Sequence, residues 1–198
     1  TAATAHYYRQ RLKSREFFSH NGLKQDSWDI HAIYLPEEEI DISVESKRLN
    51  DIMDSHDCVN VFLSEGAGVD NIVKDLESKG TNVKRDAFGH VRLDEINPGK
   101  WYAKKIAEWT GAKKVLVQKS GYFARSAAPN QNDISLIDRI SEKAVDYALN
   151  NRSGVVALSD DHNQEIKCID FTKIKGRKPF DCNQAWYQEM LNEIGQKK

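Results

Sequence analysis

Residues 58–68 read CVNVFLSEGAG, and this stretch decides the fold that we expect. Its first part, CVNVFL, is a largely apolar run with β-branched and aromatic residues, which is typical of a strand buried on both faces of a parallel sheet. The glycine-containing SEGAG follows as a turn, and a helical pattern of apolar residues begins at Asp70. This order of strand, tight turn and helix predicts one unit of a layered α/β fold.

The same alternation of short apolar runs and helical patterns continues on both sides of this unit. Further strands are expected at HAIYL (31–35), KKVLVQ (113–118), GVVAL (154–158) and EIKCIDF (165–171), the last two as a hairpin. Further helices are expected at 1–15, 44–53, 101–109, from an N-cap at Asp133 to Ala148, and at 183–198. We therefore predict an α/β fold, a three-layer sandwich with a mainly parallel sheet and a C-terminal β-hairpin plus helix, in a single domain over 1–198.

Composition and charge narrow the possible functions. The chain of 198 residues has a formal net charge of -1, so no excess of basic charge favours nucleic acid or an anionic membrane as a partner. Neither a bilayer-spanning apolar run nor a signal peptide is present in the sequence, so a cytoplasmic location is expected. Cys58, Cys168 and Cys182 are far apart and lack C-x-x-C spacing, which indicates neither a zinc site nor a disulfide framework.

Three expected strands end in polar or glycine-rich segments, where ligands of parallel α/β sheets usually bind. PEEE follows the first strand, SEGAG the second, and SGYFAR the third. Glu65 in SEGAG can accept hydrogen bonds from sugar hydroxyls, although an ordinary surface glutamate beside a tight turn is the structural alternative. SEGAG also matches two glycines of a G-x-G-x-x-G dinucleotide fingerprint, with Asn71 at the third position and Asp86 where a ribose-binding carboxylate is expected.

The stretch KSGYFAR at 119–125 carries groups that suit a phosphorylated sugar. Tyr122 supplies an apolar ring and a hydroxyl, and Arg125 supplies a planar guanidinium that fits a phosphate. Lys119 adds a second cation, and Gly121 allows the chain to leave the strand sharply. The alternative is a loop with an exposed arginine and a packed tyrosine, and these residues alone leave the choice open.

Three longer stretches together resemble the pyrophosphate-dependent 6-phosphofructokinases. They are VNVFLSEGAGVDNIV (59–73), RDAFGHVRLDEINPGKWYAKKIA (85–107) and VLVQKSGYFARSAAPNQND (115–133), and the resemblance covers nearly the whole chain. It implies a two-domain α/β enzyme of glycolysis that uses Mg²⁺ and transfers a phosphoryl group from pyrophosphate to fructose 6-phosphate. The segment G-Y-x-x-R-S-A, where ATP-dependent relatives tend to have G-H-x-x-R-G-G, looks like the pyrophosphate branch.

The resemblance also implies roles for particular residues. Glu65 would bind hydroxyls of the sugar, and Tyr122 and Arg125 would bind its phosphate. Phe123 and Ala124 would shape the segment between them, and Lys119 is a secondary candidate for the same phosphate.

Several motifs of this family are absent from the sequence. The G-G-D-D donor loop, the T-x-D-N-D segment with the catalytic base, and the Met-Gly-Arg motif do not occur. We therefore expect the C-terminal, sugar-phosphate-binding half of such an enzyme, with no catalytic residue of its own. The start at Thr1, inside a helical pattern and without a methionine, agrees with a fragment.

The expected partners follow from the same resemblance. They are fructose 6-phosphate, pyrophosphate and Mg²⁺ held mainly through the other half, and copies of the same protein in a dimer or tetramer. Two alternatives stay open: a non-catalytic sugar-phosphate-binding or assembly module, and a dinucleotide-binding oxidoreductase domain.

Overall fold

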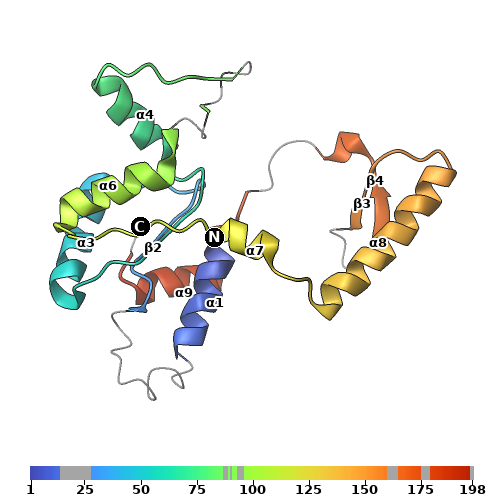
Figure 1. The fold of residues 1–198 in the computed structure, drawn as a ribbon, viewed down its shortest axis with the longest axis horizontal. Helices are drawn as coiled ribbons and strands as arrows, with labels where there is room; N and C mark the ends of the chain where they lie inside the picture. Colours follow the sequence, from blue (N-terminus) through green and yellow to red (C-terminus); the bar gives the residue numbers. More distant parts are fainter. Residues whose placement is uncertain are drawn as a thin grey trace. The chain divides into compact units, whose positions relative to one another are not determined.

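The computed structural model describes residues 1–13, 28–86, 89, 91–92, 96–159, 165–174 and 179–196. The chain groups into two compact units (Figure 1). Unit 1 comprises Thr1–Val117 and Phe180–Lys198, and unit 2 comprises Gln118–Pro179. The two units are described separately, and the single domain expected over 1–198 stays a prediction.

Unit 1 is built on a parallel sheet of two strands. Strand β1, Ala32–Tyr34, pairs with strand β2, Val61–Leu63, so that Ala32 lies opposite Val61. Helix α3, Ile42–His56, connects them and begins at Asp41, whose carboxylate accepts hydrogen bonds from two backbone N–H groups of the first turn. This strand, helix, strand order confirms the α/β class predicted from the sequence.

The two faces of β1 pack against different helices. Ile33 joins a cluster with α1, Ala2–Lys13, and α9, Ala185–Glu193. Its neighbours Ala32 and Tyr34 join a second cluster with α3, with α4 and with α6. The bounds of the last two helices are Val69–Ser78 and Pro98–Thr110. Because successive side chains of a strand point to opposite faces, unit 1 has helices on both sides of its sheet and thus three layers.

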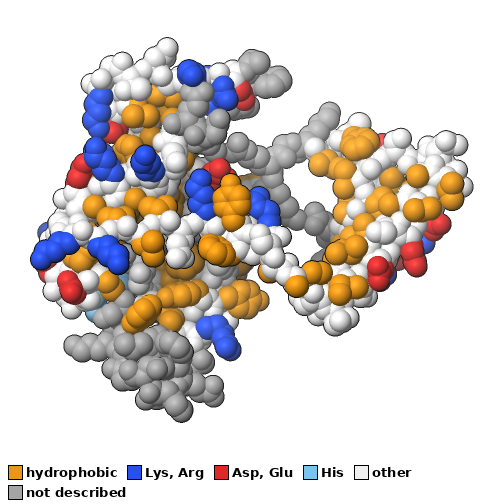
Figure 2. Space-filling view, viewed as in Figure 1, with side chains coloured by type: hydrophobic (Ala, Val, Ile, Leu, Met, Phe, Trp, Pro, Cys, Tyr) orange, Lys and Arg blue, Asp and Glu red, His pale blue; other side chains and the backbone are white. Residues whose placement is uncertain are grey.

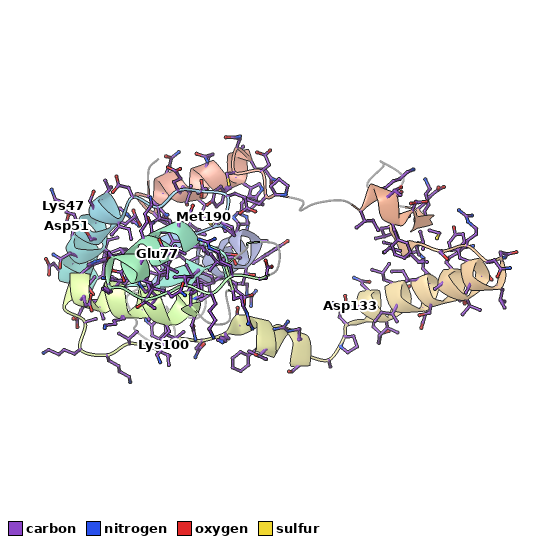
Figure 3. The ribbon with its side chains drawn as sticks, turned by 90° about the horizontal axis from the view of Figure 1, so that it is seen from above. Lys47, Asp51, Glu77, Lys100, Asp133 and Met190 are labelled. Atoms are coloured by element: carbon purple, nitrogen blue, oxygen red, sulfur yellow. The ribbon has the colours of Figure 1, made fainter. Side chains whose placement is uncertain are left out.

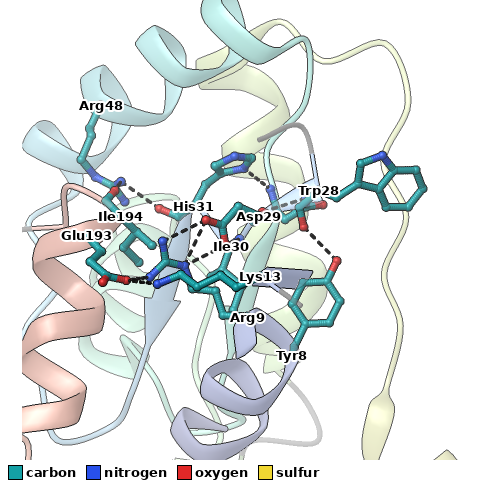
Figure 4. A network of polar contacts seen from close by, with 11 residues as sticks. Tyr8, Arg9, Lys13, Trp28, Asp29, Ile30, His31, Arg48, Glu193 and Ile194 are labelled. Carbon is teal, nitrogen blue, oxygen red and sulfur yellow. Dashed lines mark hydrogen bonds and ion pairs between the residues drawn. The ribbon is translucent and has the colours of Figure 1, made fainter. Parts of the chain in front are cut away.

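Charged side chains tie these helices to the start of β1 (Figure 4). The Arg9 guanidinium of α1 donates to Asp29 at 2.8 Å and to Glu193 of α9. Arg48 of α3 donates to the carbonyl oxygen of His31 at 2.8 Å. These side chains are partly buried, so charge-assisted hydrogen bonds hold three helices around the start of β1.

Unit 2 consists of helices and a hairpin. Its elements are α7 (Ser120–Ser126), α8 (Gln131–Leu149), the strands β3 (Val155–Leu158) and β4 (Ile166–Ile169), and the 3-10 helix η2 (Phe171–Lys173). Strands β3 and β4 pair antiparallel, which confirms the predicted hairpin. Figure 2 shows hydrophobic side chains over the surface of this unit, and no residue of α8 is buried.

The start of α8 corrects one prediction. The N-cap is Asn130, whose side chain accepts from the Asp133 N–H at 3.0 Å. The Asp133 carboxylate accepts in return from the Asn130 N–H at 3.1 Å. Asp133, labelled in Figure 3, is therefore the third residue of a capping box and not the N-cap.

The strand expected at 113–118 is not formed. Residues 112–119 belong to no helix or strand, and Val115, Leu116 and Val117 are exposed by 48%, 74% and 49%. A strand needs a neighbour for its backbone N–H and C=O groups, and β2 pairs only with β1 among the described residues. The prediction for this segment was wrong, and the parallel sheet described here has two strands.

Candidate functional site

The turn at 64–68, SEGAG, lies at the carboxyl end of β2 and leads into α4. The Ser64 N–H donates to the carbonyl oxygen of Tyr34 at 2.9 Å, which ties the turn to the end of β1. Gly68 is the N-cap of α4 with φ of 59°, a left-handed conformation that favours glycine. The predicted strand, turn and helix are thus present, and the turn lies where ligands of parallel sheets bind.

The back of this turn packs tightly against three side chains. A Cβ atom at Gly66 would lie 3.3 Å from Pro36 Cγ. A Cβ atom at Gly68 would lie 1.8 Å from Tyr102 Oη and 2.9 Å from Ile40 Cδ1. The second glycine therefore serves close packing and backbone conformation together, and the turn follows the shape of the core beneath it.

Glu65 is exposed at this turn. Its carboxylate makes no hydrogen bond or ion pair with any residue that the structure describes. Both oxygens are therefore available to accept hydrogen bonds from a polyhydroxyl ligand. The same observation is compatible with an ordinary surface glutamate, and the role of Glu65 stays a prediction.

Asn71 has a structural role in the first turn of α4. Its amide nitrogen donates to the carbonyl oxygen of Ile40 at 2.9 Å and so links α4 to the segment before α3. A dinucleotide fingerprint needs a small residue at this position so that helix and strand pack closely. The Asn71 amide occupies that space, which disfavours the dinucleotide alternative.

The stretch around Tyr122 forms helix α7, not the loop that was expected after a strand. Arg125 folds back over its first turn, where Nε donates to the carbonyl oxygen of Gly121 at 3.1 Å. The guanidinium carbon lies 5.3 Å from the centroid of the Tyr122 ring, in a cation–π arrangement. Tyr122 is 63% exposed, so the alternative of a packed tyrosine is wrong for the described structure.

One short helix thus collects the residues that the sequence suggested for a phosphate. These are Lys119 at the N-cap, Tyr122, Phe123, Ala124 and Arg125. Lys119 and Arg125 are exposed, and neither forms an ion pair with a described residue. Phe123 is 71% exposed, and the side chain of Ala124 lies outside the described part. Glu65 belongs to unit 1 and this helix to unit 2.

The arrangement of metal-ligating side chains and cysteines can be described for part of the chain. Among them, no three histidine, cysteine, aspartate or glutamate side chains gather closely enough to hold a metal ion. The three cysteines form no disulfide among the described residues, and Cys182 is buried. Within the described part of the chain, no helix has the length and apolar character needed to cross a bilayer.

Comparison with known proteins finds similar chains. Over all 198 residues the chain is 48% identical to the pyrophosphate--fructose 6-phosphate 1-phosphotransferases of Methylotuvimicrobium alcaliphilum and Methylomonas methanica, and 46% identical to that of Mastigamoeba balamuthi. This similarity over the whole chain is consistent with a fragment of that phosphotransferase family. The chain spans about half of the family members that it matches, 48% of the length of each. No protein-family model and no solved structure matches this chain.

The sequence did not reveal the side chains that support the Glu65 turn. The glycines of the turn lie close to Pro36 and Ile40, both in the connection between β1 and α3, and to Tyr102 of α6. Only Gly68 carried a signal, since a glycine at the start of a helix can mark a close approach of another group. Which group approaches depends on how α6 packs, and local sequence does not contain that information.

Proposed function

We propose that this chain is the fructose 6-phosphate-binding part of a pyrophosphate-dependent phosphotransferase. The identity of 46–48% over the whole chain to relatives with that name carries the proposal. In the complete protein, a phosphoryl group would pass from pyrophosphate to the 1-hydroxyl of the sugar. The exposed polar groups of the two clusters support a role in holding that sugar.

Arg125 and Tyr122 would hold the 6-phosphate. The planar guanidinium donates from several N–H groups, and those other than Nε have no hydrogen-bond partner among the described residues. The Tyr122 hydroxyl is exposed beside it and can donate to a phosphate oxygen. Lys119 would add charge, while Phe123 and Ala124 would maintain the shape of α7.

Glu65 would hold the sugar ring. A carboxylate accepts hydrogen bonds from two adjacent hydroxyls, and the turn that carries it is fixed to the ends of both parallel strands. Phosphoryl transfer depends mainly on positioning and charge neutralisation, so a firmly held acceptor is a real contribution to catalysis.

The remaining chemistry belongs to residues outside this chain in our proposal. Binding of pyrophosphate and removal of the proton from the 1-hydroxyl would fall to the other half of the enzyme. Mg²⁺ would be bound there as well, because no metal-binding cluster exists among the described residues. A cytoplasmic location and assembly into dimers or tetramers complete the proposal.

A chimaera tests this function directly. The 198 residues would replace the aligned part of the Methylotuvimicrobium alcaliphilum relative, and fructose 1,6-bisphosphate formation would be measured with pyrophosphate. We expect turnover that requires both substrates. A folded chimaera that binds fructose 6-phosphate but does not turn over would favour the non-catalytic module, and one that binds NAD instead would favour the dinucleotide alternative.

A further inference from the structure

The side chain of Tyr102 lies directly beneath the turn that carries Glu65. It belongs to α6 and is 2% exposed. Its hydroxyl is so close to Gly68 that a Cβ atom there would come within 1.8 Å of Oη. The polar end of this tyrosine is therefore aimed at the backbone of the turn.

Among the described residues, this buried hydroxyl has no hydrogen-bond partner. The nearby Asn71 amide donates instead to the carbonyl oxygen of Ile40. Burial raises the pKa of Tyr102 to about 12, and the polar Asn71 amide nearby lowers it by less, although its geometry does not make a hydrogen bond to the hydroxyl. A buried and unpaired hydroxyl costs folding free energy, so its presence calls for an explanation.

The other two large buried tyrosines of unit 1 are paired. The Tyr34 hydroxyl donates to Glu45 at 2.6 Å, and the Tyr187 hydroxyl donates to Glu38. All three rings are almost completely buried. Only the tyrosine under the Glu65 turn lacks a partner within the described part of the chain.

The turn above Tyr102 contains backbone hydrogen-bond donors. The backbone N–H groups of Glu65, Gly66 and Gly68 donate no hydrogen bond to the described residues. A small shift of the turn would therefore allow one of them to donate to Tyr102 Oη. Such a bond would fix the turn at the position from which the Glu65 carboxylate projects.

We propose that Tyr102 is a positioning residue for Glu65, whose hydroxyl accepts a hydrogen bond from the 64–68 turn when that turn holds the sugar. The inference rests on the proposed function, because it takes the sugar-binding role of Glu65 as given. It explains why a tyrosine rather than a phenylalanine occupies this apolar site.

The test compares Tyr102→Phe with the unmodified chimaera described above. The substitution keeps the ring and removes only the hydroxyl. We expect the KM for fructose 6-phosphate to rise roughly 2- to 10-fold, as for the loss of one neutral hydrogen bond. The KM for pyrophosphate and the kcat should stay unchanged. Thermal stability should be equal or higher, because the hydroxyl has no partner in the free protein.

Tyr34→Phe is the matched control. It removes a buried hydroxyl that is paired, from a ring whose centroid lies 5.6 Å from that of Tyr102. We expect a lower Tm, since the Glu45 carboxylate loses a donor, and an unchanged KM for fructose 6-phosphate. A purely structural role for Tyr102 would leave the KM for fructose 6-phosphate unchanged in both substitutions.

Two outcomes separate this inference from the proposed function. An unchanged fructose 6-phosphate KM in Tyr102→Phe, with a raised KM in Glu65→Gln, overturns only the role of Tyr102. An unchanged KM in Glu65→Gln overturns the sugar-binding role of Glu65 itself and with it this inference. Calorimetric titration with fructose 6-phosphate measures the affinity of the 198-residue chain and of its variants. It tests the same expected order of the variants without depending on turnover.

Discussion

At Gly68, backbone conformation and packing impose the same requirement. Its φ of 59° disfavours any side chain, and the space for a Cβ atom is already occupied by Tyr102. Gly80 has φ of 77° but nothing within 4 Å of the same position, so it isolates the backbone contribution. Comparison of substitutions at the two glycines therefore separates the cost of the backbone conformation from the cost of steric overlap.

Gly68→Ala should therefore destabilise unit 1 more than Gly80→Ala does. The left-handed conformation alone costs a non-glycine residue about 1–2 kcal/mol, which is the loss expected at Gly80. Displacement of a buried tyrosine adds to this cost at Gly68. Urea unfolding followed by tryptophan fluorescence measures the free energy of unfolding of both variants. Equal losses of this free energy would contradict the close approach of Tyr102.

Arg125→Ala should weaken binding of fructose 6-phosphate in the chimaera. A hydrogen bond to a charged group contributes roughly 1.5–3 kcal/mol, or about a 10- to 150-fold rise in KM. Arg152→Ala is the matched control, because that guanidinium lies 4.7 Å from the centroid of the Tyr147 ring in a similar cation–π pair. A KM that rises equally in both variants would point to net charge and not to a specific site.

At the scale of elements, Asp75 joins α4 to α6. Its carboxylate accepts from the indole N–H of Trp101 at 2.9 Å and lies 3.3 Å from the Lys105 ammonium. Hydrogen bonds from Lys79 and Trp101 lower the pKa of Asp75 to about 2. The side chain is 21% exposed, so water partly screens these interactions.

The stability that Asp75 contributes should depend on pH in a defined direction. A carboxyl group with a lowered pKa in the folded state stabilises the fold above its unfolded pKa of about 4. That contribution is lost as the pH falls towards about 2. Asp75→Asn should therefore lower the Tm at pH 7, and its difference from the unmodified chain should shrink between pH values of about 4 and 2.

Glu77→Gln is the control for that measurement. Glu77 lies on the same helix, is exposed, and has no ion pair with a described residue (Figure 3). The same change in charge should leave the Tm nearly unaltered at both ends of the pH range. A decrease in the Tm of Asp75→Asn that does not change with pH would show that packing, and not charge, accounts for the effect.

Elements with a strong local pattern could be predicted from the sequence. The strands at HAIYL and CVNVFL, the turn between β2 and α4, and the hairpin β3–β4 follow from apolar runs and turn residues alone. The strand at 113–118 could not be predicted in this way, because pairing depends on a neighbouring edge that local sequence does not specify. Likewise, GYFAR folds as helix α7 because the residues after Gly121 favour a helix.

The candidate site was predictable in part. The chemistry of Glu65, Tyr122 and Arg125 was visible in the sequence, because carboxylate, hydroxyl and guanidinium groups followed expected strand ends. The cation–π contact between Arg125 and Tyr122 and the burial of Tyr102 result from the fold. A hydroxyl without a partner can be recognised only when all of its neighbours are known.

At the scale of the whole molecule, activity should require more than these 198 residues. We expect the purified chain to form no fructose 1,6-bisphosphate from fructose 6-phosphate, pyrophosphate and Mg²⁺, because our proposal assigns pyrophosphate binding and proton removal to the other half of the enzyme. A coupled assay with the active chimaera as the positive control checks this. Turnover by the 198-residue chain would contradict our division of roles.

The exposed segment Val115–Val117 has a consequence for the behaviour of the chain in solution. Three consecutive apolar residues with high β-propensity present unpaired backbone donors and acceptors, which is the template that another extended chain needs for edge-to-edge pairing. Lys113 and Lys114 immediately before them are charges of the kind that oppose such pairing. We therefore expect these two lysines to oppose self-association, and replacing both should make the protein aggregate at lower concentrations.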